Sequence, residues 1–253
     1  MRAQLPVGPL VVALMLAAGC ESTPTPTGPS GTLQVSTSAS TLRAGDTATV
    51  TAAAAGAPVT SLTWTSSDAS VASVSVAGVV TAVRAGRVTI TGASGSGSQS
   101  ATGQVAIRVV PNFAGTWTGP LLRVLPTCAT ASAAPVCVPT TRPDVLLAPV
   151  TLTLTQVGAV VAGTLVDGLE PMVAVPLDGR VDDSEVLELG GRSLTASADV
   201  SRRLTVSGLR ATYDPTVQTL SGSFVLLAEQ RAAGGTFTID YSLRAQFRDI
   251  TRR

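Results

Sequence analysis

Apolar and polar residues alternate with a period of two along most of the chain beyond residue 31. Ala48, Val50 and Ala52 alternate with threonines, and Val150 and Leu152 do the same further along. A period of two predicts half-buried β-strands, and no stretch of this region shows the 3.6-residue period of a helix. The pattern therefore predicts an all-β protein.

The first predicted folded unit is residues 31–110, where short β-branched runs are separated by Gly, Ser and Asp. The breaks fall at Gly45, Asp68, Gly78 and Gly86. Many short strands with turn residues at such spacing are typical of a β-sandwich.

The order of motifs in this unit resembles a known family. Its central string is Leu62-Thr-Trp64-Thr-Ser-Ser-Asp68, then Val71-Ala-Ser-Val74, Gly78-Val-Val-Thr-Ala82 and Ala85-Gly-Arg-Val-Thr-Ile90. This string is similar to bacterial immunoglobulin-like (Ig-like) domains of group 2. The resemblance implies a β-sandwich that serves as a spacer or adhesion module on bacterial surfaces, and it assigns no binding residue. We expect Trp64 to fill the core and Asp68 to cap the turn before Val71.

The second predicted unit is residues 111–253, which contain seven of the eight aromatic residues. Alternation predicts strands over 150–155, 160–166, 204–213 and 218–227, with turns at Gly158 and at Asp214-Pro215. The last predicted strand, 237–248, is the longest. Its predicted inner face comprises Phe237, Ile239, Tyr241, Leu243, Ala245 and Phe247. Long neighbouring strands joined by tight turns predict an antiparallel up-and-down β-barrel.

The start of this unit, Phe113-Ala-Gly115-Thr-Trp117-Thr-Gly119, is similar to the Gly-x-Trp opening of the calycin barrels, which include lipocalins and avidins. The resemblance implies that Trp117 closes one end of the barrel. It also implies a cation-π contact from an arginine of the last strand, Arg244 or Arg248. The chain has no room for the helix that follows a lipocalin barrel. A barrel of eight strands is either filled by its own side chains or holds one small ligand, and the sequence leaves both open.

The first 19 residues have the features of a secretion signal: Arg2 precedes an apolar run that is too short to span a membrane. The run ends in Leu16-Ala-Ala-Gly-Cys20, which resembles the lipobox of bacterial lipoproteins. That resemblance implies cleavage before Cys20 and a lipid anchor on its sulfur and amine. Residues 20–30 would then be the lipidated Cys and a Pro/Thr linker, extended to roughly 30 Å.

The amino-acid composition limits the kinds of catalysis and metal binding that the protein could perform. All 17 basic residues are Arg, against 16 acidic residues, and the chain contains no His. A protein without His lacks the usual general base and the commonest metal ligand, so we expect no metal and no cofactor. Loss of Arg2 with the leader makes the exported chain neutral, which argues against a nucleic-acid partner.

Cys128 and Cys137 are the two cysteines that remain besides Cys20. A pair of cysteines in an exported protein predicts a disulfide. They lie in a loop expected to run from Pro126 to Pro149, and a bridge over so short a segment would stabilise the fold by about 2.5 to 3 kcal/mol.

The densest acidic run is Asp182, Asp183, Glu185 and Glu188. Such runs can ligate Ca²⁺ or supply the carboxylates of a glycoside hydrolase. No glycine lies at the bend of the run, and Glu185 and Glu188 would point to opposite faces of a strand. A solvated loop and edge strand is the simpler interpretation. Tyr213, beside the turn at Asp214, is the one aromatic residue expected to be free to stack on a glycan.

Together these features predict a non-catalytic, lipid-anchored protein of the bacterial cell envelope, on the outer membrane or cell surface. Its Ig-like unit would act as a spacer or adhesion module for a barrel that binds a glycan, a small apolar ligand or an envelope protein. The alternatives are a purely structural protein with a filled barrel, and a hydrolase that uses the acidic run.

Overall fold

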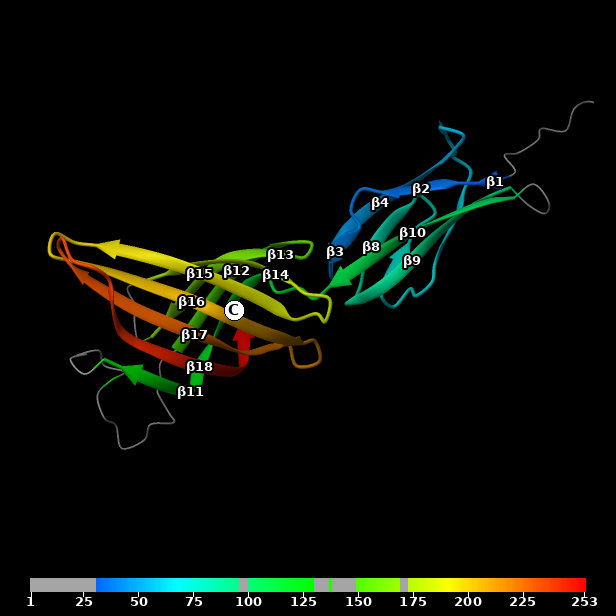
Figure 1. Cartoon of the computed structure of the whole chain (residues 1–253). Coiled ribbons are helices and arrows are strands. Elements are labelled where there is room, and N and C mark those ends of the chain that lie inside the picture. Colours follow the sequence, from blue (N-terminus) through cyan, green and yellow to red (C-terminus); the bar gives the residue numbers. More distant parts are fainter. Residues whose placement is uncertain (1–30, 96–99, 130–136, 138–148, 169–172) are drawn as a thin grey trace, which may run out of the picture.

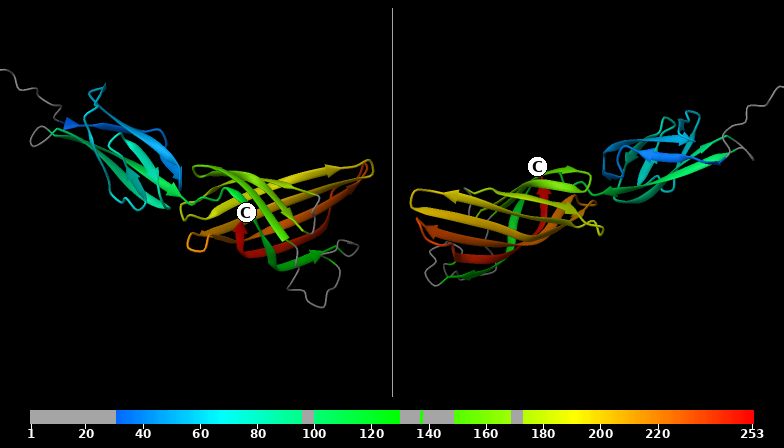
Figure 2. Two further views of the ribbon diagram at one scale, coloured as in Figure 1. Left: turned by 180° about the vertical axis from the view of Figure 1, so that it is seen from behind. Right: turned by 45° about the horizontal axis from the view of Figure 1, so that its top comes forward.

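The chain folds into two β units that lie end to end (Figure 1). The computed structural model describes residues 31–95, 100–129, 137, 149–168 and 173–253. The N-terminal β1 lies at the end of the first unit that faces away from the second unit, as all views agree (Figures 1 and 2). The residues described include no helix with the length and apolar character needed to cross a membrane. The predicted all-β fold is confirmed.

The first unit is a sandwich of two sheets. One has the strand order β1-β10-β9-β6, with β3 also paired to β10, and the other has the order β2-β4-β8-β7, with β5 paired to β4. The β1/β10 and β3/β10 pairs are parallel. The strands are β1 (Gly31–Thr32), β2 (Gln34–Thr37), β3 (Thr41–Arg43), β4 (Thr47–Ala54), β5 (Ala57–Pro58), β6 (Thr63–Ser66), β7 (Ala72–Val74), β8 (Val79–Ala82), β9 (Gly86–Ser94) and β10 (Ala101–Val110).

The core of the sandwich lies between the inward-facing residues of both sheets, as the alternation predicts. In β4 the buried positions are Ala48, Val50 and Ala52, while the intervening threonines are exposed. Trp64 on β6 is half-buried and packs against both apolar clusters of the unit. It therefore joins the two parts of the core instead of lying fully inside one of them.

The turn after β6 is held by Asp68, as the sequence predicts. Its Oδ1 accepts hydrogen bonds from the Ser70 amide at 2.9 Å and the Ser70 hydroxyl at 2.5 Å. These bonds, the hydroxyl first, hold the pKa of the Asp68 carboxyl below its usual value. The turn directs the chain into Val71, which is buried.

The second unit is a closed, eight-stranded antiparallel barrel in which each strand pairs with its neighbours in sequence and β18 pairs with β11. This is the predicted up-and-down order. The strands are β11 (Gly115–Cys128), β12 (Pro149–Val157), β13 (Val160–Asp167), β14 (Val175–Val181), β15 (Leu187–Ala196), β16 (Val200–Asp214), β17 (Thr219–Ala232) and β18 (Thr238–Arg252).

Side chains from all eight strands pack into one continuous cluster inside the barrel. Trp117, Tyr241, Phe224 and Phe247 are its largest members on the strands, and each is at most 2% exposed. Leucines and valines from β12 to β17 fill the space between them. The described part of the barrel is thus a packed core, which favours the filled alternative over an internal ligand site.

The alternation in the last strand breaks at Asp240. Tyr241 and Phe247 are buried as predicted, but Ile239 is 57% exposed and Asp240, predicted to face solvent, is 5% exposed. The register between β17 and β18 shifts at this point. A bulge adds one residue and reverses the direction of all side chains before it, so the predicted inner face is wrong for Phe237 and Ile239.

The predicted disulfide between Cys128 and Cys137 is confirmed, with the two Cα atoms 5.8 Å apart. Cys128 is the last residue of β11, so the predicted loop begins after Cys128 and not at Pro126. Cys137 packs against the barrel core. The bridge therefore fastens the chain beyond β11 to the barrel.

The contact between Trp64 and Gly92 is the first point to test. A Cβ at Gly92 would lie 2.6 Å from Cζ3 of Trp64, so Gly92→Ala must displace the indole ring. We expect the Ig-like unit to lose about 1 to 3 kcal/mol of stability, measured by urea unfolding with tryptophan fluorescence. Gly190→Ala, whose added carbon meets nothing closer than 3.5 Å, is the control. A Gly92→Ala variant as stable as the parent would contradict this packing.

Candidate binding site at the joint between the two units

The end of the barrel nearest the first unit is closed by three aromatic rings. Tyr213 meets the ring of Trp117 edge-on at 5.8 Å and that of Phe113 at 6.3 Å between centroids. Trp117 donates its indole N–H to the carbonyl of Phe113 at 2.8 Å. Tyr213 follows the buried Leu209 and Ala211 on the inner side of β16, and its ring is half-buried.

An arginine of the last strand lies over Trp117, as the resemblance to calycins implies, but it is Arg252. Its Cζ is 4.5 Å from the indole centroid, and its guanidinium donates to the carbonyl of Asn112. The predicted residues, Arg244 and Arg248, are exposed on the outside of the barrel. The prediction was wrong because β18 continues to Arg252, past irregularities in its pairing with β11 and β17.

The segment that connects the units, Pro111 to Phe113, is fixed by one buried side chain. The Oε1 atom of Gln156 accepts from the Phe113 amide at 2.7 Å. Its Nε2 atom donates to the Pro111 carbonyl at 3.0 Å and to the Gly158 carbonyl at 2.9 Å. Gln156 occupies an inward position at the end of β12 and is only 7% exposed. The bonds to Phe113 and Pro111 are buried and the bond to Gly158 is partly buried, so the contact is costly to break.

Asp182, Asp183 and Glu185 lie in the hairpin turn between β14 and β15, Glu188 lies on β15, and part of the run contacts the first unit. Asp183 pairs with Arg87 at 3.0 Å and with Arg108 at 3.2 Å, and Arg108 also donates to the carbonyl of Asp182. Arg87 is highly exposed and contributes little, whereas the side chain of Arg108 is only 17% exposed. The run thus helps to join the units, a role that its charge pattern did not reveal.

The other three acids of the run have different surroundings. The Oδ1 atom of Asp182 accepts from the amides of Ser184 and Val186 and shapes the turn. Glu188 pairs with Arg210 at 3.1 Å, and Arg210 also reaches Asp182 at 3.5 Å. Glu185 has a φ of 65° and is exposed. Within the described ranges, no three potential ligands among His, Cys, Asp and Glu gather as a metal site would require.

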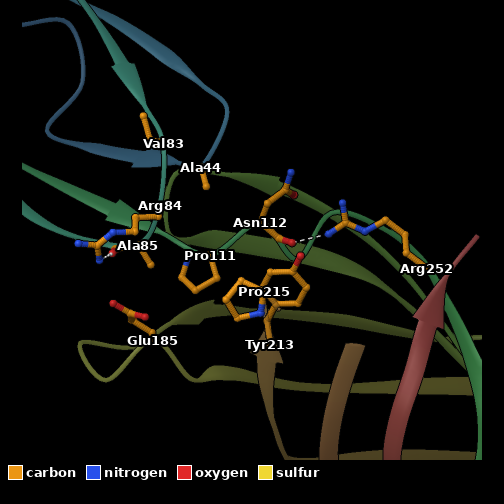
Figure 3. Close-up of a pocket in the computed structure, with 10 residues that line it drawn as sticks. All are labelled: Ala44, Val83, Arg84, Ala85, Pro111, Asn112, Glu185, Tyr213, Pro215 and Arg252. Atoms are coloured by element: carbon orange, nitrogen blue, oxygen red, sulfur yellow. Dashed lines mark hydrogen bonds between the residues drawn. The ribbon is translucent and has the colours of Figure 1, made fainter. Parts of the chain in front are cut away.

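A pocket of about 360 Å³ lies where the two units meet (Figure 3). Both units and their connection contribute to it. The first unit supplies Ala44, Val83, Arg84 and Ala85, the connection supplies Pro111 and Asn112, and the barrel supplies Glu185, Tyr213, Pro215 and Arg252. Two of the sequence-predicted candidates, Glu185 and Tyr213, are therefore brought together. Asp182, Asp183 and Glu188 are not among the lining residues.

A second polar feature lies on the outside of the barrel, far from the joint. Arg203 donates to both carboxylate oxygens of Glu229, at 2.6 and 2.5 Å. Its guanidinium and that of Arg231 lie over the ring of Phe237, with Cζ 4.2 and 4.8 Å from the centroid. The hydrogen bonds from Arg203 lower the pKa of Glu229, burial opposes this effect, and the charges of Arg203 and Arg192 add to it. The same bonds raise the pKa of Arg203.

Comparison with known proteins identifies the first unit. Residues 32–105 match the sequence model of the family described as bacterial Ig-like domain (group 2). The N-terminal unit is therefore a bacterial Ig-like domain, as its motifs indicate. No curated protein matches the chain.

A solved structure of unknown function from Bacteroides ovatus is similar over 85% of this chain and 92% of its own. The two sequences are 11% identical, and the TM-score is 0.24. The predicted lipid anchor, Cys20, lies outside the described residues.

The clamp formed by Gln156 can be tested with Gln156→Leu, which keeps the volume but removes the amide. Three backbone groups lose a buried partner, and we expect the barrel to lose about 3 kcal/mol or more. The measurement is urea unfolding, together with small-angle X-ray scattering to detect a looser joint. Gln246→Leu, at an exposed position of β18, should change neither quantity. Unchanged stability in Gln156→Leu would refute the clamp.

The ion pair of Glu229 predicts a pH dependence. Because the pKa of Glu229 is lower in the folded chain than in the unfolded chain, its contribution is fully present above the unfolded value. That contribution is lost as the pH falls through the folded value. We expect the stability difference between the parent and Glu229→Gln to shrink below about pH 4. Unfolding free energies of both proteins, measured from neutral to acidic pH, check this. If the difference between the parent and Glu229→Gln stays constant, the ion pair with Arg203 does not stabilise the fold.

Proposed function

We propose that this protein is a non-catalytic, lipid-anchored component of the bacterial cell envelope, in which the Ig-like unit holds the barrel away from the membrane. The observation that carries the proposal is the linear arrangement of the parts. The strand nearest the leader, β1, lies at the end of the Ig-like unit opposite the barrel (Figures 1 and 2). An anchor at Cys20 and an extended linker would continue the same line.

The joint supports presentation of the barrel in a defined orientation. Gln156 holds the connecting segment through three hydrogen bonds, and Arg108 links the β14–β15 hairpin to the Ig-like unit. A flexible spacer would need neither contact. A barrel held in this way can present one side to a partner in the envelope or on its surface.

The packed interior supports recognition on the outer surface in preference to the lumen. The buried aromatic and aliphatic side chains of the barrel pack into one cluster, which leaves a calycin-like internal ligand site without support in the described residues. The ion pairs of Asp182, Asp183 and Glu188 with arginines give no support to a hydrolase either.

The anchor is tested with Cys20→Ser in the full-length protein. We expect the parent to incorporate labelled palmitate and to fractionate with membranes, and the variant to do neither. Three acyl chains attach a protein almost permanently, since each buried CH₂ contributes about 0.8 kcal/mol. The control is Cys128→Ser/Cys137→Ser, which removes the disulfide but keeps Cys20 and should stay labelled. A Cys20→Ser variant that remains membrane-bound and labelled would overturn the proposal.

A further inference from the structure

The joint pocket, lined by both units and by the segment between them, has the size of a small-molecule site. Its volume of about 360 Å³ falls within the range of roughly 300 to 1,000 Å³ in which proteins hold small ligands. Because the clamp of Gln156 fixes the Pro111–Phe113 segment, one wall is held in place in the free protein. A ligand here would not have to order that wall before binding.

The apolar part of the lining consists of rings. Pro111, Pro215 and Tyr213 all line the pocket (Figure 3). The ring of Tyr213 is held in place by its edge-on contacts with Trp117 and Phe113. Rigid, flat apolar surfaces of this kind suit ligands with flat C–H faces, because packing on them costs little conformational entropy.

The cationic groups of the lining are already engaged. Arg252 stacks on Trp117 and donates to the Asn112 carbonyl. Arg84 donates to the Ser70 hydroxyl at 2.9 Å and pairs with Asp68 at 3.4 Å. A phosphate, sulfate or carboxylate ligand would have to compete with these contacts. The presence of two arginines likewise disfavours a cationic ligand.

The lining polar groups that have no hydrogen-bond partner include both acceptors and donors. Among the described residues, the carboxylate of Glu185 and the hydroxyl of Tyr213 have no hydrogen-bond or ion-pair partner. The Asn112 side chain uses its oxygen to accept from the Ala114 amide, which leaves its NH₂ group to donate. The pocket thus offers a strong acceptor, a donor and a hydroxyl around rigid rings.

We propose that the joint pocket binds a neutral saccharide of one or two sugar residues. Sugar hydroxyls would donate to Glu185 and accept from Asn112 and Tyr213, while a C–H face would pack on Tyr213 and Pro215. Because the lining comes from both units, the bound sugar also bridges them and stiffens the joint. Binding by the purified protein does not depend on the lipid anchor, so this inference and the proposed function fail separately.

The test is isothermal titration calorimetry on the full-length protein. The probes are glucose, galactose, mannose, N-acetylglucosamine and their disaccharides, with inorganic phosphate and free arginine as charged comparisons. We expect saturable binding of at least one neutral sugar. We expect Glu185→Gln to weaken it by about tenfold or more and Tyr213→Phe by about three- to tenfold.

Two features of these variants distinguish a loss of sugar binding from a loss of folding. Tyr213→Phe keeps the ring that packs on Trp117, and Glu185→Gln keeps the side-chain shape, so the melting temperature of each should match the parent. Glu188→Gln, the same change three residues along on a carboxylate paired with Arg210, should leave the affinity unchanged.

Three results would overturn the proposal. The first is no binding of any neutral sugar at about 20 mM, a concentration that would detect even weak sites. The second is sugar binding that neither pocket variant weakens, which places the sugar elsewhere. The third is tight binding of phosphate or arginine in place of a sugar.

Discussion

The joint of this protein depends on the hydrogen bonds of one amide side chain. Gln156 ends an inward-facing row of apolar residues, where a polar group is costly unless it is satisfied. It is satisfied by the Phe113 amide and by the carbonyls of Pro111 and Gly158. The same bonds set the position of Phe113, which packs beside Trp117 and Tyr213. Gln156 therefore supports three features at once: the closed end of the barrel, the connection and one wall of the joint pocket.

The packing of the barrel determines where recognition can occur. Trp117, Phe224, Phe247 and the aliphatic side chains around them pack into one cluster in the described part of the lumen, which favours recognition outside it. The described surface offers polar regions instead, among them the joint pocket and the arginine pair around Phe237. Among the described residues, the joint pocket combines a concave shape, rigid rings and unengaged polar groups of more than one kind. A protein of this design would recognise its partner between the units and use the barrel as a rigid wall.

The sequence predicts much of the fold because the strand signal is local. Alternation of Ala48, Val50 and Ala52 with threonines identifies a strand without knowledge of its partners, and the motif around Trp64 identifies the Ig-like unit. The errors arise where a distant pairing changes a local pattern. A bulge beside Ala228 turns Asp240 inward and Ile239 outward, and only the register with β17 reveals it. Asp183 likewise gains its role from Arg108, 75 positions earlier. The proximity of Glu185 and Tyr213 follows from the pairing of β15 with β16, in which Leu187 lies opposite Ala211.

The parallel pairs at the edge of the Ig-like unit determine how the protein would respond to mechanical force. A stretching force between the N-terminal segment and the barrel acts on the Ig-like unit at Gly31 and at Val110. It draws β1 and β3 in one direction and β10 in the other. Because these strands are parallel, the pull is a shear along their length. The hydrogen bonds of Thr41 to Arg43 with β10 are strained together and do not open one after another. The module is therefore arranged to transmit tension to the barrel before it unravels.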